Sequence, residues 1–178
     1  MAMRNNANIV LIGMPGSGKS TLGKRLATQR GLKFLDADKL IEKDQNLPIQ
    51  EIVNLRGVRY LRQVEEQVLC TLNCTRTVIA TGGSAVFSEA AMAHLGQGGV
   101  RLYLRISLPT LLRRVSNVHS RGLAKLPSHP LVRLYTERLP LYAAAADITM
   151  DNDWPLTGVR VAECHQLIDE YLSKEEAV

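Results

Sequence analysis

The sequence contains no long hydrophobic run, and this absence bears on where the protein works. None of its apolar stretches reaches the roughly 18 consecutive residues that a membrane-spanning helix needs. The first residues, MAMRNNANIVLIG, include an apolar run that is too short for a signal peptide. We therefore expect a cytoplasmic protein without a membrane partner.

Cysteine is also scarce. The three cysteines, Cys70, Cys74 and Cys164, are too few and too scattered for a disulfide framework. Cys70 and Cys74 are four residues apart, but no matching Cys/His pair follows that would complete a metal site. We expect all three to be free thiols.

Aromatic residues make up only 4% of the chain, although its net charge is +5, from 22 Lys and Arg against 17 Asp and Glu. A positive charge is compatible with nucleic-acid binding. However, the basic residues do not form one block, and few aromatic side chains are available for stacking on bases. A small anionic substrate held in a cleft fits this composition better, and we expect no nucleic-acid partner.

The chain does contain a regular alternation of strand and helix patterns. Its 178 residues suit one domain, and we expect a single domain over 1–178 that acts as a monomer. The alternation predicts an α/β fold in which helices cover both faces of a parallel sheet. Strands are expected at 8–13, 32–38, 77–81, 100–106 and 147–150. Helices are expected at 18–30, 40–44, 49–55, 60–72, 88–95, 131–139 and 155–172, and another begins with Ser107 as its N-cap.

Residues 116–130 lack this periodicity and carry Gly122, Pro127 and Pro130. An aperiodic segment of this length between two helices is typical of a functional loop. We expect it to be a lid.

The first expected strand runs into GMPGSGKS, residues 13–20, which fits the pattern G-x-x-x-x-G-K-[ST] in full. A strand before this motif and a helix after it provide the context of a phosphate-binding loop. Lys19 is expected to reach the outer phosphates of a nucleotide, and the Ser20 hydroxyl to ligate Mg²⁺. The pattern indicates ATP binding but not the reaction, because motors, switches and small-molecule kinases share it. The expected nucleotide-binding residues are Gly13, Gly16, Ser17, Gly18, Lys19, Ser20 and Thr21.

Two aspartates, Asp36 and Asp38, end the second expected strand. In extended chain, residues two apart point to the same side, so both carboxylates would enter one cleft at the carboxyl edge of the sheet. One could then support Mg²⁺ while the other accepts a proton from an attacking hydroxyl. The alternative is a helix cap, because Asp is a favoured N-cap residue.

Two arginines and a second pair of glycines complete the set of candidates. Arg62 has Glu65 and Glu66 three and four residues later, which indicates either a solvated ion pair or an arginine held by Glu65 so that it can clamp a carboxylate. Arg138 allows the same choice between the surface of a helix and a site. Gly82 and Gly83 follow a strand, where glycine indicates that something approaches the backbone closely.

These motifs together resemble the shikimate kinases along nearly the whole chain. The shared motifs, in the order and spacing of that family, are GMPGSGKST, LDADKLIE, LRQVEE, TGGSAV, SRGL and ERLPLY. The resemblance implies a three-layer α/β/α P-loop kinase fold with a mostly five-stranded parallel sheet and a mobile lid. It also implies transfer of a phosphoryl group from MgATP to shikimate, giving shikimate 3-phosphate.

On the acceptor side, the resemblance implies a role for five residues. Asp38 would hold the ring hydroxyls of shikimate and help to activate the attacking one. Arg62 and Arg138 would clamp the substrate carboxylate. Gly82 and Gly83 would offer backbone groups to the ring hydroxyls.

On the donor side, Asp36 would support the magnesium and Arg114 would lie along the adenine. Arg121 would swing in with the lid towards the phosphates and the substrate. Lys19, Asp38 and Arg121 are thus the expected catalytic residues.

The chain departs from the family pattern around the acceptor site. Ser84 stands where the family usually has a third glycine, Leu61 where it has an aromatic residue, and Gly122 where it has proline. If Ser84 has a positive φ, it is strained; otherwise its hydroxyl is free to donate a hydrogen bond. The departures leave two alternatives to a shikimate kinase, namely a kinase for another polyhydroxylated acid such as gluconate, and a non-catalytic nucleotide-binding relative.

Overall fold

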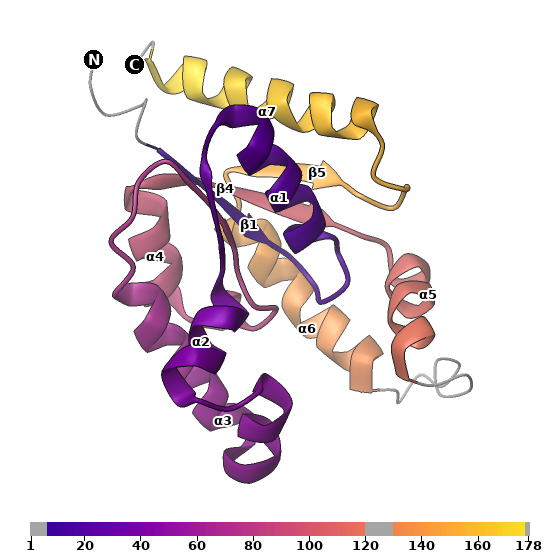
Figure 1. The fold of residues 1–178 in the computed structure, drawn as a ribbon. Helices are drawn as coiled ribbons and strands as arrows, with labels where there is room; N and C mark the ends of the chain where they lie inside the picture. Colours follow the sequence, from indigo (N-terminus) through magenta and orange to yellow (C-terminus); the bar gives the residue numbers. More distant parts are fainter. Residues whose placement is uncertain (1–6, 120–129, 177–178) are drawn as a thin grey trace.

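A five-stranded parallel sheet is the centre of the molecule (Figure 1). The computed structural model describes residues 7–119 and 130–176. The sheet order is β2-β3-β1-β4-β5, and each neighbouring pair of strands is parallel. The strands are β1 (Asn8–Ile12), β2 (Lys33–Asp36), β3 (Thr77–Ala80), β4 (Gly99–Arg105) and β5 (Ile148–Asp151).

Helices cover both faces of this sheet, as the alternating sequence pattern predicts. Helices α1 (Lys19–Arg30) and α7 (Gly158–Glu176) lie on one face, where Leu22 and Cys164 belong to the same buried cluster as Leu11 of β1. Helices α4 (Glu89–Gln97), α5 (Leu108–His119) and α6 (Pro130–Ala145) contribute to the core on the other face. The predicted three-layer α/β/α fold is therefore confirmed.

The central strand shows why a continuous apolar run marks a buried strand. All five residues of β1 are buried, and successive side chains point to opposite faces of the sheet. Leu11 thus joins the core beneath α1 and α7, whereas Val10 and Ile12 join the core beneath α4 and α6. When both faces of a parallel sheet are covered, the even-numbered and the odd-numbered residues of its central strand must both be apolar.

Helices α2 (Ala37–Gln45) and α3 (Ile49–Cys70) form a unit with a small core of its own. Ile41, Ile52 and Val64 are its buried residues. The two helices expected at 49–55 and 60–72 are joined in α3, which breaks at Gly57 with φ 82°. The glycine makes this left-handed conformation accessible.

Several element boundaries differ from those expected. Strand β2 ends at Asp36, so Asp38 belongs to a helix and not to an extended strand. Helix α6 continues through Pro140 to Ala145, because the buried Arg138 and Tyr142, four residues apart, both pack against Gly83. Helix α7 begins at Gly158 rather than Pro155.

The expected lid is only partly covered by the described residues. Residues 116–119 belong to α5 and Pro130 begins α6. Residues 120–129, which include Arg121 and Gly122, lie outside the described residues.

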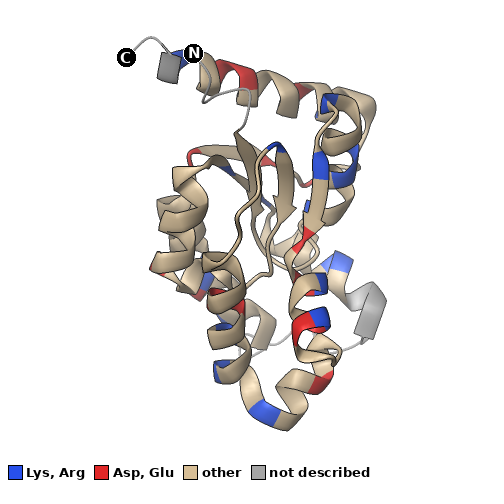
Figure 2. Cartoon of the chain, turned by 60° about the vertical axis from the view of Figure 1, so that its left-hand side comes forward, with Lys and Arg blue, Asp and Glu red and all other residues tan. Residues whose placement is uncertain are grey.

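The thiols and charges match the pattern seen in the sequence. Cys70, Cys74 and Cys164 are all free, as expected, and Cys164 is buried between α7 and the sheet. Figure 2 shows Lys and Arg distributed over several helices and interspersed with Asp and Glu. In the part of the chain that the structure describes, no helix combines the length and the apolar character required to cross a bilayer.

The burial of the central strands predicts a matched pair of stability effects. Leu102 of β4 is fully buried, whereas Leu55 of α3 is 70% exposed. Leu102→Ala is expected to lower the free energy of unfolding by about 2–5 kcal/mol, because it removes buried apolar atoms and leaves a cavity. Leu55→Ala is expected to change it by less than about 0.5 kcal/mol. Urea unfolding measures both, and equal losses would contradict this account of the core.

Candidate active site

The phosphate-binding loop lies between β1 and α1, at the carboxyl edge of the sheet. Gly18 caps α1 with φ 98°, a conformation that favours glycine. A Cβ at Gly18 would also lie only 2.9 Å from Asn152 Nδ2. The loop therefore brings backbone N–H groups and the N-terminus of a helix to one place, which is the arrangement that binds phosphate.

Lys19 is buried at the base of this loop, with 8% of its surface exposed. Its Nζ donates hydrogen bonds to Gly13 O at 2.7 Å and to Met14 O at 2.9 Å. Burial lowers the pKa of Lys19 to about 8, against the opposing effect of Asp38, Glu65 and Asp36. A nearby anion would favour the charged form of this lysine.

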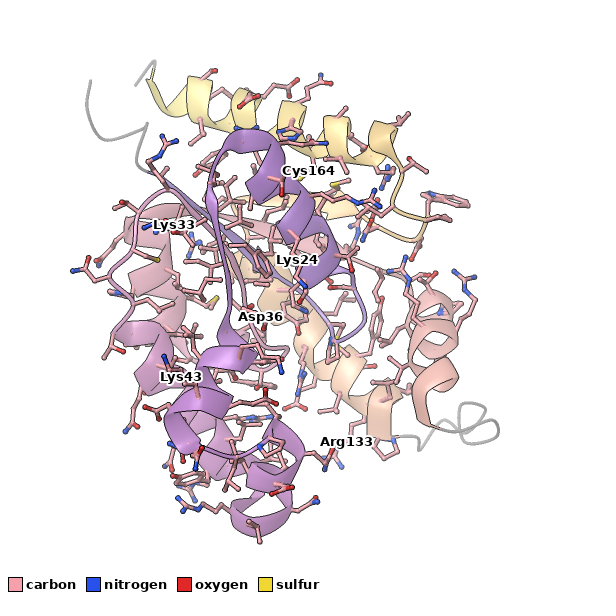
Figure 3. All side chains as sticks on the ribbon, viewed as in Figure 1. Lys24, Lys33, Asp36, Lys43, Arg133 and Cys164 are labelled. Atoms are coloured by element: carbon pink, nitrogen blue, oxygen red, sulfur yellow. The ribbon has the colours of Figure 1, made fainter. Side chains whose placement is uncertain are left out.

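Asp36 and Ser20 meet at the start of α1. The Ser20 hydroxyl donates to Asp36 Oδ2 at 2.9 Å, and Asp36 Oδ1 accepts from the backbone N–H of Asp38 at 3.2 Å. Asp36 is thus the N-cap of α2, and the helix-cap alternative is confirmed for this residue. Figure 3 shows Asp36 near the middle of the molecule, where β2 passes into α2.

The expectation that Asp36 and Asp38 project together from an extended strand is wrong. Asp38 stands in the first turn of α2, because the Asp36 side chain caps the helix and ends the strand. The two carboxylates nevertheless line one cleft of about 330 Å³ with Lys19 and Ser20. Shielding by the surrounding protein raises the pKa of Asp38, and the neighbouring charge of Asp36 raises it further.

The cleft joins the phosphate loop to the second pair of glycines. Its remaining lining residues are Pro15, Gly16, Gly18, Thr21, Thr81 and Gly83. One end is therefore the nucleotide loop and the other is the turn that follows β3.

Glycine is needed at positions 82 and 83 because neighbouring atoms pack closely against them, and not because of their backbone conformation. Neither has a positive φ. A Cβ at Gly82 would overlap Glu65 Oε1 and lie 2.8 Å from Asp38 Oδ1. A Cβ at Gly83 would lie 2.7 Å from the Pro15 ring. The two glycines thus let the phosphate loop, α2 and α3 approach the same short piece of backbone.

Arg138 reaches this turn from α6, and it is 7% exposed. Its Nη1 donates to Gly83 O at 2.8 Å, and the Tyr142 hydroxyl donates to the same oxygen at 2.6 Å. The surface alternative for Arg138 is therefore excluded, because the guanidinium faces the turn and not solvent.

Arg62 lies near the same place, but its partner is not the expected one. The guanidinium carbon of Arg62 is 3.7 Å from the ring centroid of Phe87. The ion pairs among the described residues do not include Arg62 with Glu65. The Glu65 carboxylate is bound instead by Ser84. Of the two alternatives for Arg62, neither the solvated ion pair with Glu65 nor the arginine held by Glu65 is found among the described residues.

Ser84 has φ −100°, so it is not strained. Its hydroxyl donates a hydrogen bond to Glu65 Oε2. Of the two consequences considered for this residue, the structure shows the hydrogen bond. The family's third glycine is thus replaced by a residue that fixes a buried carboxylate.

Glu65 is 3% exposed, and its Oε1 has no hydrogen-bond partner in the described part of the chain. Burial raises the pKa of Glu65 to about 7. The Ser84 hydroxyl and the charges of Arg138 and Lys19 act in the opposite direction, and the charge of Asp38 adds to the increase.

Arg114 is bound to the donor end of the site. Its Nη1 donates to Gly16 O at 3.2 Å, and its Nη2 donates to Asn152 O at 2.7 Å. Arg114 therefore connects α5 to the phosphate loop and to the segment after β5. Its expected contact with adenine stays a prediction, and Arg121 lies outside the described residues.

Sequence reasoning missed three residues that shape the site. Asn152 is 3% exposed and donates from Nδ2 to Ser17 O at 2.7 Å, which secures the phosphate loop. Tyr142 supports Gly83, and Phe87 contacts Arg62. Asn152 could have been found, because it directly follows the last strand at the carboxyl edge of the sheet. No local pattern marks Tyr142 or Phe87.

Comparisons with known proteins agree on one family. The sequence model described as shikimate kinase matches residues 15–169. A shikimate kinase of Nitrobacter winogradskyi is 36% identical over 95% of this chain and 80% of its own length. One of Rhodopseudomonas palustris is 39% identical over 92% of this chain and 82% of its own length.

A solved structure resembles the chain over almost its whole length. Shikimate kinase from Acinetobacter baumannii in complex with shikimate has a TM-score of 0.79 and 30% sequence identity. The similarity covers 97% of each chain.

The Ser84–Glu65 contact predicts a change in one titration. Ser84→Ala removes a donor that favours the ionised carboxylate, so the pKa of Glu65 is expected to rise further above about 7. Carbon-13 NMR titration of the Glu side chains measures this, with Glu65→Gln to assign the signal. Ser173→Ala on α7, whose hydroxyl donates to Asp169 O, is the matched control and should leave the titration unchanged. An unchanged or lowered pKa in Ser84→Ala would contradict the contact.

Proposed function

The chain belongs to the shikimate kinase family, and from this premise we propose that it transfers the terminal phosphoryl group of ATP to a ring hydroxyl of shikimate. The product is shikimate 3-phosphate. One observation carries the proposal: Arg62 and Arg138 both lie against the Phe87 ring. That ring is next to the Gly83 turn, which lines the cleft that also contains Lys19 and Asp38. Two guanidinium groups beside a carboxylate base suit an acceptor that has both a carboxylate and a hydroxyl.

The donor end of the cleft would hold ATP. Backbone N–H groups of the loop from Gly13 to Gly18 would contact the phosphate oxygens, together with the N-terminus of α1. Lys19, now bonded to Gly13 O and Met14 O, would turn to the outer phosphates when ATP binds. Thr21 also lines the cleft, and Arg114 is placed to border the nucleotide.

The residues at this end fit a magnesium ion. Ser20 Oγ and Asp36 Oδ2 are oxygen atoms 2.9 Å apart at the start of α1. Mg²⁺ is usually held by one or two such protein oxygens together with waters and phosphates. Within the described residues no group of three or more His, Cys, Asp or Glu forms a closed metal site, which agrees with that sparse coordination. When bound, the ion would neutralise charge on the phosphates.

The acceptor would lie between the glycine turn and α3. Arg62 and Arg138 would bind its carboxylate, and Asp38 would accept the proton of the attacking hydroxyl. Backbone groups of Gly82 and Gly83 would contact the ring hydroxyls. The raised pKa of Asp38 brings this carboxyl closer to the range that suits a general base.

The chain's own contribution to the reaction would be placement and charge. Phosphoryl transfer needs the two oxygens in line and the charge on the transferred group neutralised. Lys19 supplies one positive charge, and we propose that Arg121, between α5 and α6, supplies another. The single-domain organisation, the monomeric state, the cytoplasmic location and the absence of nucleic-acid and membrane partners stay predictions.

A panel of hydroxylated acids tests the proposal. In a coupled ADP-release assay with MgATP, shikimate is expected to be turned over well above the ATPase background, and gluconate is not. Turnover of gluconate alone would identify a sugar-acid kinase. ATP binding by calorimetry with no turnover of any acceptor would identify a non-catalytic nucleotide-binding relative.

The role of Asp38 gives a sharper prediction. Asp38→Asn is expected to lower kcat about 10²- to 10⁴-fold, because the amide cannot accept the proton. The affinity for ATP, measured by calorimetry, should change little. Asp44→Asn, on the exposed end of the same helix α2, is the matched control. Equal kcat values for the two variants would exclude Asp38 as the base.

A further inference from the structure

Phe87 ends the short 3-10 helix η2 (Ala85–Phe87), directly after the glycine turn. Its half-buried ring lines a pocket of about 280 Å³ together with Arg62, Glu65 and Ser84. This pocket lies on the α3 side of the turn.

Two arginines from different helices meet at this one ring. The guanidinium carbon of Arg62, on α3, is 3.7 Å from the ring centroid, and that of Arg138, on α6, is 5.4 Å away. Two like charges brought together repel each other. An aromatic face attracts each cation, and the attraction grows as the pair is removed from water. The ring therefore offsets part of the cost of bringing Arg62 and Arg138 together.

This mode of support leaves the arginines available to an anion. A carboxylate partner would occupy the N–H edges of a guanidinium, whereas a ring contacts only its face. Among the described residues Arg62 makes no ion pair or hydrogen bond, and the Nε atoms of Arg62 and Arg138 are buried without partners. Arg138 is held by backbone, since its Nη1 donates to Gly83 O, and it also interacts with the Tyr142 hydroxyl.

The ring itself is fixed by the turn. The backbone N–H of Phe87 donates to Ser84 O at 3.0 Å, and the Ser84 hydroxyl is bonded to Glu65 of α3. The family pattern has an aromatic residue directly before the arginine of α3, where this chain has Leu61. Here the aromatic ring beside Arg62 comes from a different element.

We propose that Phe87 is a positioning residue of the acceptor site, whose ring holds Arg62 and Arg138 side by side with their N–H edges directed to the acceptor carboxylate. This inference rests on the proposed function. Phe87 acts through the two arginines and takes no part in the chemical step.

The charges around the pair are compatible with an anionic ligand. Arg62, Arg138, Lys19 and, at the pocket's edge, Arg59 supply positive charge, while Glu65, Glu66 and Asp38 are acidic groups nearby. The pKa of Glu65 is raised to about 7, so this carboxyl opposes an incoming anion less than an exposed glutamate would. The acceptor's carboxylate would thus be the anionic partner of Arg62 and Arg138.

The test compares the affinity for shikimate with that for its neutral carboxamide. Phe87→Leu removes the aromatic face but keeps an apolar side chain. It is expected to weaken shikimate binding about five- to thirty-fold, from the loss of two cation–π contacts. Calorimetry in the presence of ADP measures this affinity. The carboxamide should bind the wild type and Phe87→Leu almost equally, because it has no charge for the arginines to hold.

Companion variants separate positioning from folding. Phe87→Tyr keeps the ring face and should restore the affinity for shikimate, whereas Phe87→Met should weaken it like Phe87→Leu and serves if that variant does not fold. Phe34→Leu is the matched control, because Phe34 also lies beneath a cation, Lys24 Nζ at 5.9 Å, but in the core beneath α1. For all variants kcat and the KM for ATP should stay near the wild-type values.

Two outcomes would overturn the positioning role of Phe87 while leaving the proposed function intact. One is Phe87→Leu binding shikimate as tightly as the wild type does. The other is Phe87→Leu losing the same affinity for shikimate and for the carboxamide, which would indicate a loss of general packing. A wild-type chain that binds no shikimate would instead overturn the proposed function and, with it, the role of Phe87.

Discussion

The site depends on one constraint, the absence of side chains at Gly82 and Gly83. Four elements approach these two residues, because Pro15, Asp38, Glu65 and Arg138 all lie where a Cβ would have to stand. The turn after β3 is therefore the point where the nucleotide loop, α2, α3 and α6 come together. A Cβ at Gly82 would displace the carboxylates of Glu65 and Asp38, and one at Gly83 would press on the Pro15 ring of the phosphate loop.

The charged side chains around this turn are held mainly by uncharged groups and not by ion pairs with each other. Lys19 is bonded to backbone carbonyls, Glu65 to a serine hydroxyl and Arg62 to the face of a ring. None of these contacts joins a full positive charge to a full negative one. Direct ion pairs would have neutralised the charges, and a triphosphate or a carboxylate would then have had to break them. The arrangement keeps the charges available for ligands.

Ser84, one of the departures from the family pattern, lies close to Arg62 and Phe87. Ser84 binds Glu65, which leaves Arg62 without its neighbour on α3, and Phe87 takes that place three residues further along the turn. Leu61 is not aromatic, and the aromatic ring that contacts Arg62 is that of Phe87. Seen one at a time in the sequence, these changes suggest a damaged acceptor site. In three dimensions Ser84 binds Glu65 and Phe87 contacts Arg62, so neither side chain is left without a role in the packing.

The sequence by itself determined the sheet, the layers and the nucleotide loop, since buried strands and the phosphate motif are local patterns of residue type. It also brought Asp36 and Asp38 to one cleft, although through a strand that in fact ends at Asp36, because an N-cap and a strand end look alike over three residues. Only the tertiary structure decided the partners of Arg62 and Glu65 and the length of α6. Those depend on contacts between residues far apart in the chain, such as Tyr142 with Gly83, 59 positions away. Local propensity carries no information about which distant side chain fills a given space, so no reading of α3 alone could have found Phe87.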